Sequence, residues 1–231
     1  AGGAAITRLG IRNGARYPTR SVLSAALVAS ATFVITAVAM NRHNVSSQEP
    51  LLSSGDGGFR WIAESDLPLY KDQFAQLTGL PAMEVFLLRV MPGEDASCLN
   101  LYRPSQPRVS GAPKGMISRG GFAFEQTLAN TLEETENPWL LLEAKTKDGA
   151  IPVFGDANSV RWVLHLRLGE TLEIEDALGR PRHLVIAGLL SRSIFQSQLI
   201  LSEKYFLEMF PGHSGYNQFL IETDSSNAGV L

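Results

Sequence analysis

The chain has 231 residues, of which 45% are hydrophobic and 19% are charged, and its formal net charge at pH 7 is −3. This composition fits a globular domain with one appendage and excludes a disordered or collagen-like chain. Residues 1–41 carry four arginines and no acid, whereas the remainder carries 16 basic and 23 acidic residues. An acidic body argues against nucleic-acid binding, which needs a basic surface. A basic arm beside an apolar run points to a membrane surface instead.

The basic arm comes first in the chain. Its arginines recur every four residues and would lie along one stripe of a helix: Arg8, Arg12, Arg16 and Arg20. We expect them at the membrane interface. They are most simply read as topogenic charge, without a specific lipid contact. Pro18 is expected to separate this arm from the helix that follows.

An uncharged run of 19 residues, Val22–Met40, lies between Arg20 and Arg42. As a helix it would be about 28 Å long, close to the hydrocarbon thickness of a bilayer. We therefore predict a transmembrane helix. Two alternatives stay open: a signal peptide, suggested by the small residues of Ala37–Ala39, and the buried helix of a soluble protein. The arginines place the N-terminal side in the cytoplasm and the acidic body outside.

Small residues recur within this run. Ala25 and Ala29, and likewise Ala26 and Ser30, are pairs four residues apart that allow close helix approach in a bilayer. Any alanine-rich helix contains such pairs by chance. We nevertheless predict that these four residues pack against other transmembrane helices.

The rest of the chain is predicted to be an α+β domain. We divide the chain into a cytoplasmic arm (1–20), a transmembrane helix (21–41), a linker (42–58) and an extracytoplasmic domain (59–231). Apolar runs between turn signals predict strands at Phe59–Ala63, Val85–Met91, Trp139–Leu142, Ile151–Phe154, Leu172–Ile174, His183–Leu190, Gln198–Leu201 and Gln218–Ile221. Helices are expected at Leu69–Thr78, Asp156–Leu166 and Ser202–Phe210, the last with Ser202 as its N-cap.

The motifs for catalysis are weak. The sequence has no G-x-x-x-x-G-K-[ST] loop for ATP. Gly212–Tyr216 (GHSGY) is better read as a turn between a helix and a strand than as a nucleophile elbow, which requires glycine in place of Tyr216. Cys98 is the only cysteine, and we read it as an ordinary apolar residue. No catalytic or cofactor-binding residue is assigned.

Metal-ligand spacing is also absent from the sequence. The four histidines are far apart, at His43, His165, His183 and His213. His165 is expected on an apolar helix as a core or boundary residue. Leu132–Glu136 (LEETE) is read as a solvated helix end and Arg119–Phe122 (RGGF) as a tight bend. Gly188 is read as a close-packing or bulge position.

Two stretches resemble a known family. Leu9–Ser24, LGIRNGARYPTRSVLS, is similar to the entry into a transmembrane segment of FtsX-like and MacB-like ABC transporter permeases, whose pattern is L-x-x-R-N-x-x-R-x-P-x-R-S. The matching residues are Leu9, Arg12, Asn13, Arg16, Pro18, Arg20 and Ser21. Ile151–Pro211 resembles the end of that family's extracytoplasmic domain, with a hairpin at Gly169–Leu190 and a serine-led segment after it. The resemblance covers less than half of the chain, and residues 45–148 do not align.

The resemblance implies a first transmembrane segment followed by a MacB-like periplasmic core. The family has further spans after this domain, which are absent here, so we expect a fragment of a longer subunit. It implies a non-catalytic permease subunit of the bacterial inner membrane, without a cofactor. Its partners would be a cytoplasmic ATP-binding subunit, membrane lipid and other transmembrane helices. ATP hydrolysis on that subunit would drive movement of a substrate outside the membrane or activate a partner there.

Two other classes of protein stay open. One is a signal-anchored extracytoplasmic hydrolase, which would need Cys98 or Ser214 near a histidine. The other is a single-span adhesion, scaffolding or binding module. The permease hypothesis predicts several more apolar runs in the native gene beyond Leu231. The hypothesis of a single-span module predicts a stop codon soon after Leu231.

Overall fold

The computed structural model describes residues 18–40, 50–72, 83–93, 106–144, 146 and 149–223. The chain divides into two compact units, Ala1–Gln48 and Glu49–Leu231, which are treated separately below. Arg8, Arg12, Arg16, His43 and Cys98 lie outside the described residues.

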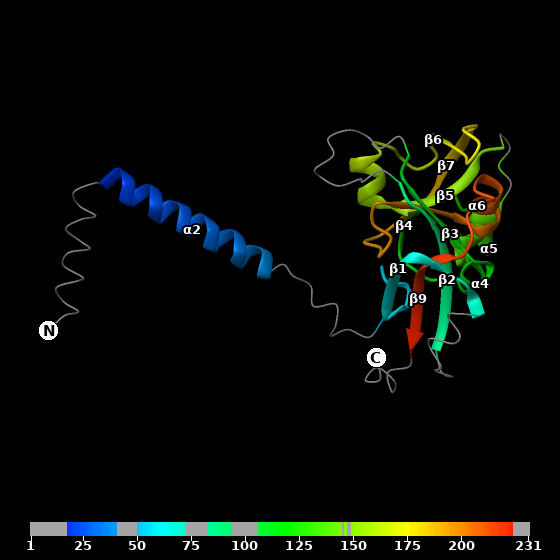
Figure 1. Cartoon of the computed structure of the whole chain (residues 1–231), viewed down its shortest axis with the longest axis horizontal. Helices are drawn as coiled ribbons and strands as arrows, with labels where there is room; N and C mark the ends of the chain where they lie inside the picture. Colours follow the sequence, from blue (N-terminus) through cyan, green and yellow to red (C-terminus); the bar gives the residue numbers. More distant parts are fainter. Residues whose placement is uncertain are drawn as a thin grey trace. The chain divides into compact units, whose positions relative to one another are not determined.

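The first unit contains helix α2, Pro18–Met40 (Figure 1, blue). It is long and apolar enough to cross a membrane, and none of its side chains is buried. Its two threonine hydroxyls donate hydrogen bonds back along the helix, from Thr32 to the carbonyl of Val28 and from Thr36 to that of Thr32, both at 2.8 Å. These bonds satisfy both polar groups inside an apolar helix.

The second unit is built on a mixed sheet of nine strands. They are β1 Trp61–Leu69, β2 Met83–Met91, β3 Arg108–Ala112, β4 Phe124–Thr127, β5 Ile151–Asp156, β6 Thr171–Glu175, β7 Pro181–Leu190, β8 Gln198–Ser202 and β9 Tyr216–Thr223. Their order is β1-β9-β2-β3-β8-β5-β7-β4, and β6 also pairs with β7. The pairs β3–β8 and β5–β7 are parallel, and the other pairs are antiparallel.

The sheet has two parts that share β2. Met83–Leu88 of β2 pairs with β9, and Arg89–Met91 pairs with β3. We call β1, β9 and the first part of β2 the small sheet, and we call the remaining strands the large sheet. Figure 1 shows β1, β9 and β2 below β5, β6 and β7. β2 therefore passes from one part to the other.

Short helices cover both faces of the large sheet. They are α4 Lys114–Arg119, α5 Leu132–Glu136, the 3₁₀ helix η2 Pro138–Glu143, the π-helical turn η3 Ser159–Val163 and α6 Glu203–Met209. One core contains Val160 and Phe206 from η3 and α6, and the other contains Ile117 and Trp139 from α4 and η2. β5 and β8 are buried along their whole length, as expected for strands covered on both faces.

The structure confirms an apolar N-terminal helix followed by an α+β domain. Seven of the expected strands coincide with β1, β2, β5, β6, β7, β8 and β9. Ser202 caps α6, its hydroxyl accepting a hydrogen bond from the Tyr205 N–H at 3.4 Å. The turn between β6 and β7 and the turn at Gly212–Tyr216 are also present.

Some expected elements were wrong. Trp139–Leu142 is part of η2 and not a strand, because the Asn137 side chain caps it and Pro138 begins it. The expected helix Asp156–Leu166 is present but shorter, because Asp156 still belongs to β5 and the helical conformation covers residues 157–163. His165 is not a core residue: it is exposed beyond η3, with a φ of 54°. In the expected helix Leu69–Thr78, Leu69 belongs to β1 and Lys71 is helical, while residues 73–78 lie outside the described residues.

The two glycine-based predictions agree with the structure. Gly120, Gly121 and Phe122 have φ values of 72°, 92° and 67°, which makes Arg119–Phe122 a tight bend. Gly188 pairs with Phe154 beside a register shift, and a Cβ on it would meet the Phe154 ring at 2.8 Å. Residues 50–58, within the stretch read as a linker, are turns packed on the domain. For example, the Phe122 N–H donates to the Leu52 carbonyl at 2.6 Å.

Candidate functional site

A polar cleft of about 460 Å³ lies where the two parts of the sheet separate. Its walls come from β1, β2, β3, β9 and the turn before β8. The lining residues are Glu64, Ser65, Asp66, Val90, Pro92, Gly93, Arg108, Gln196, Ser197 and Asn217. A volume of this size suits a small ligand or part of a larger one.

A wide bulge in β1 forms one wall. Glu64 pairs with Gln218 and Leu69 pairs with Tyr216, so four residues of β1 lie opposite Asn217 alone. The Asn217 side chain bridges the gap by donating to the Ser65 carbonyl at 3.1 Å. The bulge moves the β1 backbone away from β9 and so opens the cleft.

Gly215 allows the backbone before β9 to approach Pro68 at the end of the bulge, where β1 and β9 pair again. Its φ is 80°, and a Cβ there would lie 2.6 Å from the Cβ of Pro68. Only glycine fits this combination of left-handed backbone and close approach.

A chain of polar side chains joins the walls. The Glu64 carboxylate accepts a hydrogen bond from Arg108 at 2.8 Å and one from Gln218 at 3.0 Å. Gln198 donates to Gln218 at 3.5 Å, and the Ser110 hydroxyl donates to Gln198 at 3.1 Å. Ser110, Gln198 and Gln218 are buried, so this chain links the small sheet to the large sheet inside the domain.

Two buried polar atoms of the lining residues lack a hydrogen-bond partner. They are Nε of Arg108 and Oδ1 of Asn217. Together with the carboxylates and amides of the walls, they give the cleft a polar character suited to binding.

The groups with shifted pKa values lie elsewhere. Backbone hydrogen bonds from Asn130 and Thr131 lower the pKa of Glu134 in the capping box of α5. The hydrogen bond and charge of Glu125 raise the pKa of Arg161. Burial works to raise the pKa of Asp176, but hydrogen bonds from Arg180 and Leu178 and the charge of Arg180 hold it below its ordinary value. All three are structural contacts.

The residues predicted from the sequence lie apart from this cleft. Arg20, Ala25, Ala26, Ala29 and Ser30 are on α2, and all are exposed. Their predicted roles at the interface and in helix packing stay predictions.

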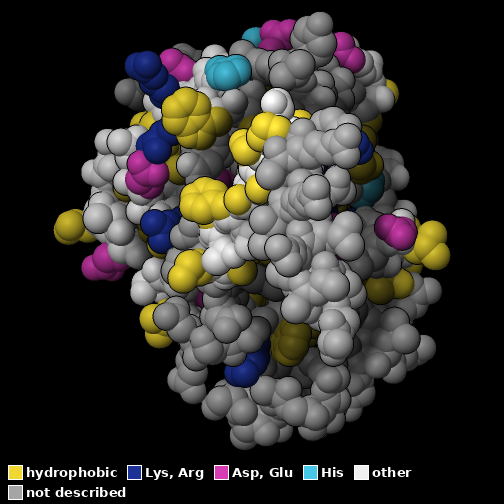
Figure 2. All heavy atoms as spheres, turned by 90° about the vertical axis from the view of Figure 1, so that its left-hand side faces the viewer, with side chains coloured by type: hydrophobic (Ala, Val, Ile, Leu, Met, Phe, Trp, Pro, Cys, Tyr) yellow, Lys and Arg dark blue, Asp and Glu magenta, His cyan; other side chains and the backbone are white. Residues whose placement is uncertain are grey.

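The candidate reactive groups do not form a catalytic arrangement among the described residues. The Ser214 hydroxyl lies 3.1 Å from the Tyr70 hydroxyl. His183 lies 3.8 Å from Glu173, with both side chains exposed. Within the described ranges, no three His, Cys, Asp or Glu side chains gather where a metal ion would bind. On the face that Figure 2 shows, basic and acidic side chains are interspersed with hydrophobic ones.

The cleft is not apparent in the amino-acid sequence, because its residues come from separate segments. Local signals existed only for its borders: Pro68 within β1, and the Pro-Gly pair at Pro92 and Gly93. Gln198 and Gln218, polar residues within apolar strands, are the other signal.

The described residues form one long apolar helix, and a mixed-sheet domain with a polar cleft follows it in the chain. No protein-family model matches the chain, and no curated protein matches it.

Two solved structures are similar to this chain at low sequence identity. The periplasmic region of MacB from Actinobacillus actinomycetemcomitans is similar with a TM-score of 0.42 and 14% identity, over 73% of this chain and 76% of that one. The extracellular domain of the noncanonic ABC-type transporter YknZ from Gram-positive bacteria gives a TM-score of 0.36 and 12% identity, over 72% and 83%.

Proposed function

We propose that the chain is part of an ABC transporter permease subunit and that its domain lies outside the membrane. The observation that carries this proposal is the arrangement of one apolar helix, α2, after the arginine-rich motif and before an α+β domain. In this proposal residues 1–20 are cytoplasmic, 21–41 span the membrane, and 59–231 form the outer domain, on which residues 50–58 of the predicted linker 42–58 pack. The membrane is the bacterial inner membrane.

The proposed role is mechanical and not catalytic. A separate cytoplasmic subunit binds and hydrolyses ATP, and the transmembrane helices pass its closure to the outer domain. That domain then moves a substrate or activates a partner outside the membrane. The chain of polar side chains Arg108, Glu64, Gln218, Gln198 and Ser110 supports this role, because its hydrogen bonds join the two parts of the sheet.

Cysteine labelling of intact cells tests the orientation. In a Cys98→Ser background, Leu178→Cys places a thiol on the turn between β6 and β7, where the side chain is exposed, and Thr19→Cys places one at the start of α2. A membrane-impermeant maleimide should label Leu178→Cys directly and Thr19→Cys only after permeabilisation. The reverse pattern would reject the proposed orientation.

Purification in mild detergent tests the partner. The full-length subunit from its native membrane should bring an ATP-hydrolysing protein with it. The matched control replaces Ala25, Ala26, Ala29 and Ser30 with leucine, which keeps α2 apolar but removes its small-residue pairs. We expect this variant to stay in the membrane and to lose the ATPase. An unchanged yield of ATPase would reject the helix-packing role, and no ATPase with either protein would reject the permease.

The polar cleft favours one alternative function, that of a single-span binding module. Its volume and polar lining suit a ligand whether or not an ATPase is present. A stop codon soon after Leu231 in the native gene, together with no co-purifying ATPase, would support this module. Further apolar runs of about 20 residues would support the permease.

A further inference from the structure

Large hydrophobic side chains gather where the chain enters the domain. Among the described residues of the second unit, ten such side chains are exposed, and four of them lie within residues 51–62. We call these four the entry patch: Leu51, Leu52, Trp61 and Ile62, with exposed fractions of 63%, 51%, 45% and 43%. The other six are spread over the far end of β1, α5, η3, α6 and the turn between β6 and β7. Single exposed apolar side chains are ordinary, whereas a group of them points to an interaction surface.

Backbone hydrogen bonds hold the first half of the entry patch in place. The Leu52 carbonyl accepts a hydrogen bond from the Phe122 N–H at 2.6 Å, and the Gly55 carbonyl accepts one from the Ile194 N–H at 3.1 Å. The turn is thus fixed on the domain while the side chains of Leu51 and Leu52 stay exposed. A surface that is already ordered loses little entropy when it is covered.

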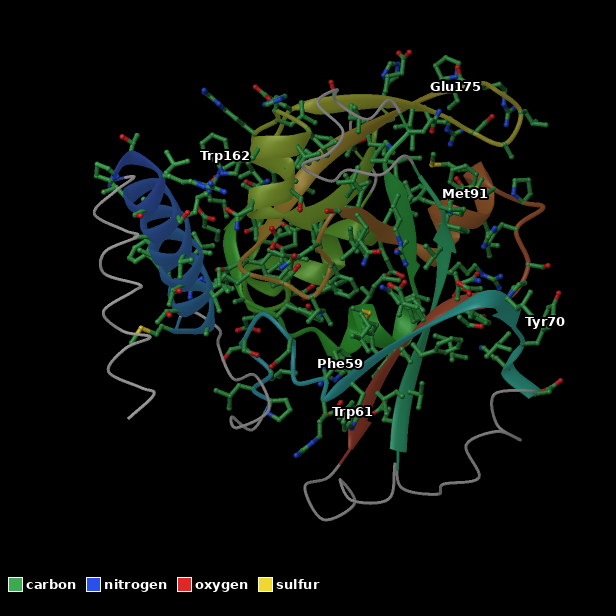
Figure 3. All side chains as sticks on the ribbon, turned by 60° about the vertical axis from the view of Figure 1, so that its left-hand side comes forward. Phe59, Trp61, Tyr70, Met91, Trp162 and Glu175 are labelled. Atoms are coloured by element: carbon green, nitrogen blue, oxygen red, sulfur yellow. The ribbon has the colours of Figure 1, made fainter. Side chains whose placement is uncertain are left out.

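The second half of the entry patch lies at one end of the small sheet. Trp61 begins β1 and pairs with Ile221, and Met83, which begins β2, pairs with Thr223 at the end of β9. Figure 3 labels Trp61 at this end of β1. Successive side chains of a strand point to opposite faces, so Trp61 and Ile62 flank the start of β1. A surface that approaches β1 end-on therefore meets both side chains.

The segment that carries the entry patch has no net charge. Residues 50–62 contain one acid, Asp56, and one base, Arg60. The Asp56 carboxylate accepts hydrogen bonds from the Gly58 N–H at 3.0 Å and from the Ser54 hydroxyl. Its charge is therefore satisfied within the turn. The entry patch offers apolar surface that needs no charged partner.

The length of the linker identifies the surface that the entry patch can reach. Nine residues, 41–49, separate Met40 at the end of α2 from Pro50 at the start of the packed turn. A chain of this length spans at most about 35 Å. In the proposed topology Met40 lies at the outer surface of the membrane, so the entry patch stays within reach of that surface. Tryptophan and leucine side chains are favoured at the boundary between headgroups and acyl chains.

We propose that the entry patch contacts the lipid of the membrane that α2 spans. Trp61 lies at the level of the headgroups, and Leu51 and Leu52 lie against the upper part of the acyl chains. The contact holds the small sheet at the bilayer and limits rotation of the domain about its linker. This inference rests on the spanning role of α2 in the proposed function and adds a lipid-binding site on the outer domain.

Quenching of tryptophan fluorescence by brominated lipid tests the contact on the full chain. The chain has three tryptophans, and the fully buried Trp139 gives a constant background. Trp162→Phe retains Trp61, whereas Trp61→Phe retains Trp162, which is 74% exposed on η3 (Figure 3). Each variant is reconstituted into phosphatidylcholine bilayers with and without bromine on the upper part of the acyl chains. We expect brominated lipid to lower the emission of Trp162→Phe and to leave that of Trp61→Phe unchanged.

Two leucine variants in the Trp162→Phe background locate the contact. Leu51→Glu places a carboxylate in the entry patch, and Leu132→Glu places one on α5, where Leu132 is 84% exposed. Thermal unfolding of both should match the parent, because both leucines are exposed. Leu51→Glu should reduce the quenching of Trp61, since a carboxylate is disfavoured among acyl chains, and Leu132→Glu should leave it unchanged.

Four outcomes would overturn the proposal. Equal quenching of Trp61 and Trp162, or equal effects of the two leucine variants, would show that the entry patch is not the contact. Emission from Trp61 that is shielded from water but not quenched would assign the patch to a protein partner. No quenching in a chain that resists alkaline carbonate extraction would reject the lipid contact and leave the proposed function standing. Extraction of the parent chain by carbonate would reject the spanning α2, and the proposed function with it.

Discussion

Gly188 lies on β7 between two aromatic rings. A Cβ at this position would meet the ring of Phe154 at 2.8 Å and that of Phe124 at 3.1 Å. We predict that Gly188→Ala lowers the free energy of unfolding by about 1–3 kcal/mol, because rings in a packed core must move to admit the methyl group. Thermal unfolding of the full chain in detergent, followed by tryptophan fluorescence, measures the change.

Gly212→Ala is the matched control for this prediction. A Cβ at Gly212 meets nothing within 4 Å. This variant should keep or slightly raise the unfolding temperature, since alanine restricts the unfolded chain more than glycine does. The same loss in both variants would show that the aromatic contacts of Gly188 are not the cause.

Asp176 closes the turn between β6 and β7. Its carboxylate accepts hydrogen bonds from the backbone of Leu178 at 2.9 Å and from that of Arg180 at 3.0 Å. Burial by itself would raise the pKa of Asp176 because it disfavours the charged form. The hydrogen bonds and the charge of Arg180 have the larger combined effect, so the pKa of Asp176 is lowered. A lowered pKa in the folded state means that the stabilisation is complete above the ordinary carboxyl pKa. It is lost as the pH falls through the folded-state pKa.

We therefore predict a pH-dependent cost for Asp176→Asn. The variant should be less stable than the parent near neutral pH, and the difference should shrink as the pH falls below about 4. Denaturant unfolding at several pH values measures it. Glu175→Gln is the control, because the adjacent Glu175 is exposed. A difference for Asp176→Asn that stays constant with pH would contradict the pKa shift.

At the scale of the elements, Arg89 joins three of them. From β2 it pairs with Glu203 of α6 at 2.8 Å and donates to the Gly215 carbonyl before β9 at 3.0 Å. Its guanidinium also lies 4.5 Å from the ring centre of Tyr216. We predict that Arg89→Lys costs about 1–3 kcal/mol of unfolding free energy, because lysine keeps the charge but loses the planar set of donors.

Arg108→Lys provides the comparison for Arg89→Lys. The Arg108–Glu64 pair is also 2.8 Å long, but its side chains are 32% and 51% exposed. An ion pair between side chains as exposed as these contributes less than about 1 kcal/mol to the free energy of unfolding. Chemical denaturation of both variants checks the order. A larger loss for Arg108→Lys would mean that the polar chain behind it matters more than exposure suggests.

The agreement between sequence and structure follows the length and the β-branched content of the apolar run. His183–Leu190 was predicted as a strand because a long apolar run between turns has few other solutions, and Ile151–Phe154, although short, contains the β-branched residues Ile151 and Val153. Trp139–Leu142 failed because a short apolar run also fits a helix, and the capping by Asn137 decides between them. Arg108–Ala112 was missed because Ser110 and Gly111 interrupt the apolar pattern, although both are buried against neighbouring elements.

The cleft was beyond prediction for a different reason. Glu64 and Arg108 come together only when β1 and β3 take their places on different parts of the sheet. No local sequence pattern predicts that β1 pairs with β9, because most of the domain lies between these two strands in the sequence. The site on α2 was predicted from composition alone, and composition does not identify the partner of a helix.

At the scale of the whole molecule, the proposal that α2 spans a membrane can be tested by a charge within it. We predict that Val28→Arg, near the middle of α2, reduces the fraction of the chain that resists alkaline carbonate extraction. An arginine at the centre of a membrane helix costs about 2.5–3.5 kcal/mol on insertion. The control is Thr19→Arg at the first turn of α2, next to Arg20, which should stay fully in the membrane fraction. Equal extraction of the two variants would contradict a spanning α2.

The position of β9 in the chain determines when the small sheet can be completed during synthesis. β1 and β2 do not pair with each other, and each pairs with β9, near the C-terminal end of the described chain. During synthesis the first two strands of the domain therefore leave the ribosome long before their common neighbour exists. β1 and the Met83–Leu88 part of β2 therefore lack this partner while most of the domain is made, although Arg89–Met91 can already pair with β3. The small sheet is completed only by β9, near the end of the described chain. A chaperone that binds nascent chains can therefore act on β1 during the whole interval before β9 is synthesised.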